Sequence, residues 1–209
     1  QARLLSCHAH NERERFVAAL AALLKDGKVA LISDAGAPAV SDPGGKLVEE
    51  AINAGVAVEI VPGPSAVVAA LMGAGFDTSR FSFLGFLPRS GGARTELIEA
   101  AARTGFAVVV YEAPQRLDDT LADLAAALGK RRVVVARELT KLHETFHRGM
   151  LGQKPSELRP AFVDKGEVVG VVEATQAGAV RDDEGRAIDV DDVAVDTSMT
   201  PKERAKKIA

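Results

Sequence analysis

The chain has 209 residues, of which 47% are hydrophobic and 26% charged, and its net charge is −3. This composition excludes a wholly disordered or collagen-like protein, and the length allows one large domain or two small ones. A single cysteine, Cys7, excludes an intramolecular disulfide, so we expect a cytoplasmic protein. The most apolar stretch, residues 56–72, is interrupted by Glu59, Pro62 and Pro64, so no segment is predicted to span a membrane.

The first 78 residues predict an α/β lobe in which helices and strands alternate. Strands are expected at residues 29–32 and 56–61, and helices at residues 12–26, 46–53 and 66–72. Asn11 with Glu14 is a helix-start signal, and Ser65 is predicted to cap the third helix. The alternation predicts right-handed crossovers and a mostly parallel sheet, with ligand-binding loops at the carboxyl ends of its strands.

Residues 79–175 repeat this rhythm and predict a second α/β lobe. Strands are expected at 81–86, 106–111, 132–136, 146–151 and 167–173, and helices at 93–103, 116–128 and near 156. Residues 176–209 form the last predicted part, an acidic linker followed by the start of a helix at Thr200 and Glu203.

Charge is distributed unevenly along the chain. Residues 79–150 hold 11 Lys and Arg against 8 Asp and Glu, a net charge of +3, whereas the segments before and after each carry −3. A polyanion, if one binds, should therefore meet the middle segment. An ordinary mixed surface is the alternative.

Three short motifs bear on the chemistry. A phosphate-binding P-loop would need Gly at position 40 and Ser or Thr at position 47, where this chain has Val40 and Leu47. The dinucleotide-binding motif G-x-G-x-x-G is also absent from the sequence. Residues 143–147 match H-E-x-x-H, which on a helix would bind zinc and leave a zinc peptidase as an alternative. Because Gly149 and the preceding apolar strand leave little room for a helix there, we expect no metal site.

Two loops rich in Gly, Pro, Ser and Asp, residues 33–44 and 62–66, follow the first two predicted strands. Such loops offer backbone amides and a carboxylate with little side-chain bulk, which suits a cofactor that carries adenosine. Tight turns without a ligand are the alternative.

Six segments carry a resemblance to a known family: SCHAHNE at 6–12, LISDAGAPAVSDPG at 31–44, VPGPSA at 61–66, GFLPR at 85–89, YEAPQRL at 111–117 and ARELTKLHE at 136–144. They resemble the tetrapyrrole methylase superfamily and, within it, the methyltransferases of 16S ribosomal RNA. The resemblance implies an α/β protein with two αβα lobes and S-adenosylmethionine in the cleft between them. From the family pattern we expect this chain to lack the first strand and glycine-rich turn of the N-terminal lobe, and we expect its last helix to be truncated.

The resemblance also implies a reaction, 2′-O-methylation of a cytidine ribose in the decoding region of 16S rRNA. An acidic chain would act on RNA within an assembled small ribosomal subunit and as a homodimer. Three other classes stay open: a methylase of a tetrapyrrole, the zinc peptidase, and a non-catalytic RNA-binding module that has no affinity for S-adenosylmethionine.

The residues expected to act fall into three sets. Cofactor contacts carried over from the family are Ser33, Asp34, Ala35, Ala37, Pro38, Ser65, Ala66, Glu112, Ala113, Leu139 and Thr140. Candidates for a base, or for a cation that stabilises a developing alkoxide, are Lys141, Arg137, His10 and Glu138. Candidate contacts to RNA phosphates are Arg89, Arg94, Arg116 and Arg148.

Overall fold

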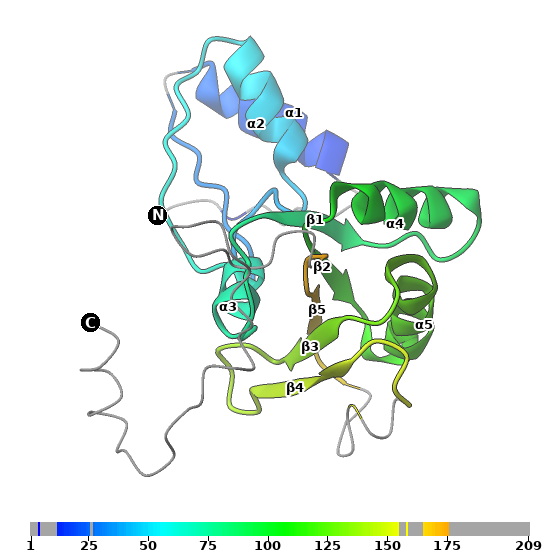
Figure 1. Cartoon of the computed structure of the whole chain (residues 1–209). Helices are drawn as coiled ribbons and strands as arrows, with labels where there is room; N and C mark the ends of the chain where they lie inside the picture. Colours follow the sequence, from blue (N-terminus) through cyan, green and yellow to red (C-terminus); the bar gives the residue numbers. More distant parts are fainter. Residues whose placement is uncertain (1–3, 5–11, 26, 155–157, 159–164, 176–209) are drawn as a thin grey trace, which may run out of the picture. The chain divides into compact units, whose positions relative to one another are not determined.

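A computed structural model of the chain describes residues 4, 12–25, 27–154, 158 and 165–175 (Figure 1). Residues 1–174 form one compact unit, which contains all the helices and strands described. None of the described helices is long and apolar enough to cross a membrane. The helix predicted near 156 and the linker and helix predicted over 176–209 lie outside the described residues.

Five strands form one sheet in the order β1-β2-β5-β3-β4. Their bounds are Phe81–Phe86 (β1), Ala107–Glu112 (β2), Arg132–Arg137 (β3), Thr145–Met150 (β4) and Val168–Val172 (β5). All five confirm the strands predicted for this half of the chain, within two residues at each end. β1 pairs parallel to β2, whereas β5 is antiparallel to both β2 and β3, and β4 is antiparallel to β3.

The sheet is therefore mixed and not mostly parallel, which corrects the expectation that the second half repeats the parallel rhythm of the first. The reason lies in the connection from β3 to β4, residues 138–144. A parallel crossover needs a dozen or more residues, so this short link can only reverse the chain. β1, β2 and β3 still run in the same direction, and their carboxyl ends lie at one edge of the sheet.

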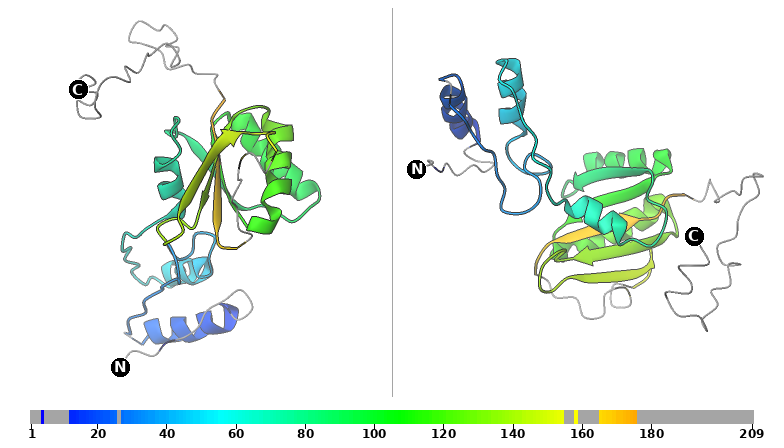
Figure 2. Two further views of the ribbon diagram at one scale, coloured as in Figure 1. Left: turned by 90° about the horizontal axis from the view of Figure 1, so that it is seen from below. Right: turned by 90° about the vertical axis from the view of Figure 1, so that its left-hand side faces the viewer.

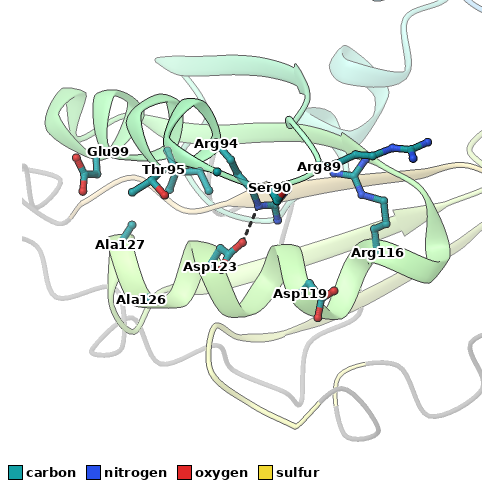
Figure 3. A pocket seen from close by; sticks show the side chains of 12 residues that line it. Arg89, Ser90, Arg94, Thr95, Glu99, Arg116, Asp119, Asp123, Ala126 and Ala127 are labelled. Atoms are coloured by element: carbon teal, nitrogen blue, oxygen red, sulfur yellow. Dashed lines mark hydrogen bonds and ion pairs between the residues drawn. The ribbon is translucent and has the colours of Figure 1, made fainter.

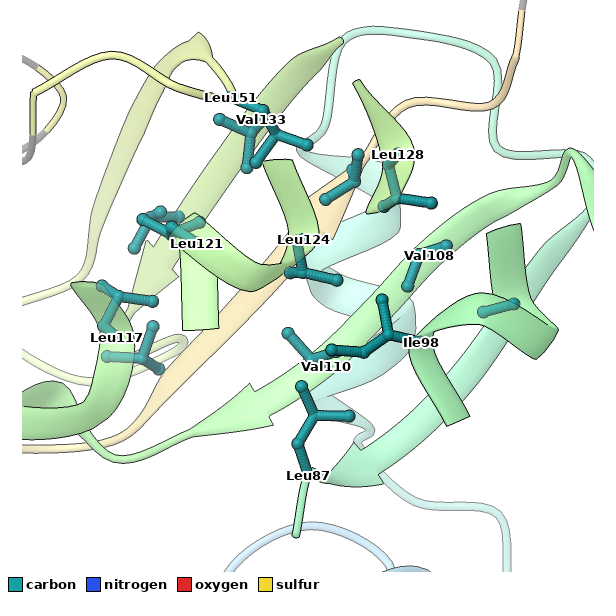
Figure 4. Packing of buried hydrophobic residues seen from close by; sticks show 14 of the residues in the cluster. Leu87, Ile98, Val108, Val110, Leu117, Leu121, Leu124, Leu128, Val133 and Leu151 are labelled. Carbon is teal, nitrogen blue, oxygen red and sulfur yellow. The ribbon is translucent and has the colours of Figure 1, made fainter. Parts of the chain in front are cut away.

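Helices cover both faces of the sheet (Figure 2). α4 (Gly92–Thr104) and α5 (Leu117–Leu128, preceded by the 3₁₀ turn η1, Pro114–Arg116) pack on one face, and α3 (Ala66–Met72) packs on the other. Along β2, Val108 and Val110 face α4 and α5, while Val109 faces α3. This alternation is the period of two expected for a strand buried on both faces. Figure 4 shows the larger core, where leucines of α5 lie over the valines of the sheet.

The N-terminal helices confirm their predictions. α1 (Glu12–Leu23) and α2 (Gly45–Asn53) pack against each other, and the Ser65 hydroxyl accepts a hydrogen bond from the backbone N–H of Val68 at 3.5 Å, which caps α3.

The strands predicted at 29–32 and 56–61 are wrong. Neither segment forms a strand with any described part of the chain. A strand needs a partner for its backbone hydrogen bonds, and without one the apolar side chains remain in solvent. Ile32, Ile60 and Val61 are accordingly 76%, 79% and 88% exposed.

Candidate functional site

The carboxyl ends of β1, β2 and β3 form a rim at one edge of the sheet. Phe86 of β1 lies opposite Tyr111 of β2, and Val168 of β5 lies between Glu112 and Arg137. The loops that leave this rim, residues 87–89, 113–115 and 138–141, contain most of the predicted site residues of the second half. Loops at this edge are where α/β proteins with parallel strands bind their ligands.

Glu138, Lys141 and Glu167 form an ionic clip at the rim. The Lys141 ammonium lies 3.2 Å from Oε1 of Glu138 and 3.0 Å from Oε2 of Glu167, and Oε1 of Glu138 also accepts the backbone N–H of Glu167 at 2.9 Å. Hydrogen bonds to Glu167 and Glu138 raise the pKa of Lys141. The backbone N–H of Glu167, and then Lys141, lower the pKa of Glu138. At neutral pH Lys141 is therefore protonated and Glu138 is ionised.

The loop 33–44 approaches two other parts of the predicted site. The Ser33 hydroxyl donates to the carbonyl oxygens of Ala35 at 3.2 Å and Gly36 at 2.9 Å, which closes a tight turn. A methyl group added to Gly36 would lie 3.8 Å from the carbonyl oxygen of Pro64, and one added to Gly85 of β1 would lie 3.1 Å from the Ser41 hydroxyl. This loop therefore lies beside both the turn that leads into α3 and the last residues of β1.

Backbone strain is concentrated in these loops. Among the described residues, the non-glycine residues with a positive φ are Ala39, Ser41, Glu138 and Thr140. Ala39 and Ser41 stand in the loop 33–44 that the sequence singled out, and Glu138 and Thr140 stand in the loop 138–141, within the segment ARELTKLHE that carries the family resemblance. Side chains rarely adopt this left-handed conformation, which costs on the order of 1–3 kcal/mol per residue and is typical of ligand-binding loops.

Tyr111 joins these elements, although it is not among the site residues predicted from the sequence. Burial raises the pKa of the Tyr111 phenol, a hydrogen bond from the backbone of Val67 at the start of α3 opposes this shift, and the charges of Asp42 and Glu167 add to it. Its ring packs edge-on against Phe83, with the ring centres 4.9 Å apart. Two features of the sequence could have indicated Tyr111: its hydroxyl stands near the end of an otherwise apolar strand, and it is the only tyrosine in the chain.

Glu112 was predicted to contact the cofactor, but its carboxylate is buried and bound within the protein. The residue is 1% exposed, and its oxygens accept the backbone N–H of Ala113 at 2.8 Å and the hydroxyl of Thr120 at 2.7 Å. The Arg116 guanidinium lies 3.4 Å away. Any cofactor contact at this position would use the backbone of Glu112 and Ala113.

The four arginines predicted to contact RNA differ in their surroundings. Arg94 is 7% exposed and donates to Asp123 at 2.6 Å, to the Pro88 carbonyl at 2.9 Å and to Thr120 at 2.9 Å, which makes it a structural residue. Arg148 donates to the Gly73 carbonyl at the end of α3 at 2.5 Å. Arg89 and Arg116 follow β1 and β2 at the rim, and Arg89 is exposed.

The remaining predicted residues are placed as follows. Ser33, Asp34, Ala35, Ala37 and Pro38 lie in the first loop, Ser65 and Ala66 at the start of α3, and Leu139 packs in the core below α3. The Thr140 backbone N–H donates to Glu144 at 2.6 Å, and Arg137 donates from Nε to the Lys165 carbonyl at 3.0 Å. His10 lies outside the described residues.

The H-E-x-x-H stretch is not a zinc-binding helix. His143 lies in a turn and His147 in β4, so the two imidazoles do not share one helix face. In the described part of the chain no three His, Cys, Asp or Glu side chains are grouped to hold a metal ion.

Residues 3–155 match the family model of the Tetrapyrrole (Corrin/Porphyrin) Methylases. The chain is 43% identical over 171 residues to ribosomal RNA small subunit methyltransferase I of Halalkalibacterium halodurans, covering 82% of this chain and 59% of that protein. It is 43% identical over 187 residues to the protein of the same name from Micromonospora olivasterospora, covering 90% and 59%. The chain thus spans about three fifths of the length of these relatives.

Solved structures agree on the fold. The methyltransferase CobJ matches with a TM-score of 0.60 and 23% identity, covering 78% of this chain and 71% of that one. Cobalt precorrin-4 methyltransferase CbiF matches with a TM-score of 0.63 and 17% identity, covering 82% and 74%. At these identities the matches establish the fold only. They confirm the predicted fold class, an α/β protein of the tetrapyrrole methylase type.

Proposed function

The chain belongs to the tetrapyrrole (corrin/porphyrin) methylases, and on this basis we propose that the whole protein transfers a methyl group from S-adenosylmethionine to the 2′-hydroxyl of a cytidine ribose in the decoding region of 16S ribosomal RNA. Methylases of this family use S-adenosylmethionine, which confirms the predicted cofactor. The RNA acceptor is supported by relatives that are 41–46% identical and named ribosomal RNA small subunit methyltransferase I. The structural observation that carries the proposal is the concentration of strained backbone in the two loops beside the rim.

The residues of this chain fit an adenosine-bearing cofactor. Ala35 and Gly36 expose their backbone in a turn held by the Ser33 hydroxyl, and no large side chain of that turn obstructs an approach. Ser33–Pro38 and the start of α3 at Ser65 and Ala66 would hold the cofactor, together with the backbone of Ala113 and Thr140. When bound, S-adenosylmethionine supplies an electrophilic methyl group on a sulfonium centre.

Positioning of the acceptor is the main contribution that this chain can make to the reaction. A ribose hydroxyl is a very weak acid, so either a base must take its proton or a cation must stabilise the developing alkoxide. Lys141 is held protonated by its two carboxylates and is therefore a cation and not a base. The lowered pKa of Glu138 makes it a weak base. Because Glu138 and Glu167 already pair with Lys141, we assign the electrostatic role to Arg137, with Lys141 fixing the loop that follows it, and we assign the loops the task of holding the reacting groups at attack distance.

The cellular setting follows from the proposed substrate. An enzyme that acts on 16S rRNA would work in the cytoplasm, and a chain with a net charge of −3 would gain RNA-binding surface from an assembled small subunit and from a second copy of itself. Both the homodimer and the assembled particle are part of the proposal.

Transfer of a labelled methyl group tests the proposal directly. The full-length protein is incubated with tritiated S-adenosylmethionine and small ribosomal subunits from a strain that lacks the enzyme. A 2′-O-methyl group blocks alkaline cleavage of the next phosphodiester bond, so the product should show one protected cytidine in the decoding region. Asp34→Asn should weaken cofactor binding severalfold, whereas Glu59→Gln, an exposed change outside the loops, should not. Label in protein or tetrapyrrole but not in RNA would refute the proposal.

A further inference from the structure

A groove runs between α4 and α5, on the face of the sheet opposite α3 (Figure 3). Its volume is about 600 Å³, and it is lined by the loop after β1 and by the facing sides of the two helices. This volume lies within the range of about 300–1,000 Å³ that is usual for small-ligand sites. The groove begins at the rim, because Arg89 follows β1 and Arg116 follows β2.

The end of the groove nearest the rim is cationic. Arg89 is exposed and, within the described residues, has no ion-pair or hydrogen-bond partner. Arg116 is fixed beside it: NH2 donates to the carbonyl oxygens of Leu87 at 2.9 Å and Pro88 at 3.3 Å, while the side chain remains 31% exposed. Figure 3 places both guanidinium groups at this end. Two neighbouring cations, one of them without a counter-charge, match a phosphate group.

The rest of the groove offers a different chemistry. Glu99 and Asp119 line it, and neither has an ion-pair partner among the described residues, whereas Asp123 is neutralised by Arg94 at 2.6 Å. Carboxylates in such a place repel a second phosphate but accept hydrogen bonds from the amino groups of bases and from ribose hydroxyls. Ala126 and Ala127, both exposed, supply a small apolar surface against which the flat face of a base can pack.

These features together match one nucleotide, with its phosphate at the rim end and its base among the carboxylates and the apolar residues. We propose that the groove between α4 and α5 binds one nucleotide of the substrate RNA, next to the segment that enters the active site. The inference rests on the proposed function and adds to it the path by which the RNA strand leaves the rim. An RNA strand is favoured over a free nucleotide because the cationic end adjoins the rim, so a chain can pass from one to the other.

Two pairs of matched variants of the full-length protein test this proposal. Arg89→Glu reverses the charge at the rim end, and its control, Arg103→Glu, makes the same change at the other end of α4. Ala127→Phe fills the groove without a change in charge, and its control, Ala100→Phe, places the same side chain at an exposed position of α4 outside the groove. The measurements are KM for small subunits in the methyl-transfer assay and the dissociation constants of a single-stranded oligoribonucleotide, of CMP and of S-adenosylmethionine.

Both groove variants should raise KM and the oligoribonucleotide dissociation constant about tenfold, while the dissociation constant of S-adenosylmethionine stays within twofold and the controls match wild type. Arg89→Ala should lower the slope of log affinity against log salt by about 0.7, the value for one phosphate contact to a single strand. Groove variants that methylate RNA like their controls would overturn this inference and leave the proposed function intact. CMP binding as tightly as the oligoribonucleotide would also overturn it, in favour of a free-nucleotide site. Absence of methyl transfer to RNA by the wild type would refute the proposed function itself.

Discussion

Thr120→Val should strongly destabilise the protein because Thr120 completes a buried polar network below the rim. The residue is 0% exposed, its hydroxyl donates to Glu112 at 2.7 Å, and it accepts from Arg94 at 2.9 Å. Valine has nearly the same shape and fills the same space. The substitution therefore removes two hydrogen bonds without opening a cavity.

The magnitude can be worked from these contacts. A hydrogen bond to a charged group contributes about 1.5–3 kcal/mol, and a buried charged group that loses its partner costs at least as much. The two bonds together set a range of about 3–6 kcal/mol. Glu112 keeps its bond to the backbone of Ala113, and Arg94 keeps its bond to Asp123. We therefore expect a loss near the lower limit, about 3 kcal/mol.

Differential scanning calorimetry measures this loss. For a protein of this size, about 3 kcal/mol corresponds to a fall of about 6–12 °C in the midpoint of thermal unfolding. Thr120→Ser is the matched control, because it keeps the hydroxyl and loses one methyl group, at a cost of about 1 kcal/mol. Equal midpoints for the valine and serine variants would show that the hydroxyl does not hold the network, and the reasoning would fail.

Two further predictions concern the rim. Tyr111→Phe removes the hydroxyl that accepts the Val67 backbone N–H and should lower the unfolding midpoint by about 2–4 °C, the effect of one lost hydrogen bond of about 1 kcal/mol; an unchanged midpoint in scanning calorimetry would contradict it. Lys141→Met removes the clip. The pKa of Glu138 is lowered, so its contribution is fully present above the ordinary pKa of a glutamate and is lost as pH falls through the lowered value. The pKa of Lys141 is raised, so its contribution is fully present below the ordinary pKa of a lysine and is lost as pH rises through the raised value. The midpoint difference between Lys141→Met and wild type should therefore be constant from pH 6 to 9 and vanish at both extremes; a difference that changes between pH 6 and 9 would contradict the assigned charges.

Periodicity predicted the strands of the second half well because each of them finds its partner within the chain. β2 and β3 are apolar runs buried on both faces, and their residues alternate between the two cores. The runs at 29–32 and 56–61 have the same composition but no described strand beside them. Composition reports the tendency of a segment to pair, whereas pairing depends on a partner that composition does not specify.

The same limit applies to the site residues. The loops 33–44 and 62–66 were predictable because glycine, proline and small polar residues mark tight turns. Strained backbone is found in 33–44 and also in 138–141, which contains neither glycine nor proline and was indicated only by the family resemblance. The roles of single side chains were not predictable, because they depend on contacts between distant parts of the sequence. Arg94 and Asp123, for instance, are 29 residues apart, and their ion pair at 2.6 Å is one of the contacts that distinguish the buried Arg94 from the exposed Arg89.

The buried polar network around Thr120 and the proposed nucleotide groove share residues of α4 and of the segment that leads into α5. Arg116 holds the carbonyl oxygens of Leu87 and Pro88, and Arg94 holds Pro88 from the other helix, so the loop that presents Arg89 is fixed from both sides. A side chain that binds a phosphate benefits when the backbone that carries it is already fixed, because less conformational freedom is then lost on binding. The buried Arg94 would therefore serve the proposed RNA contact indirectly, because it fixes the loop that presents Arg89 without touching a phosphate itself.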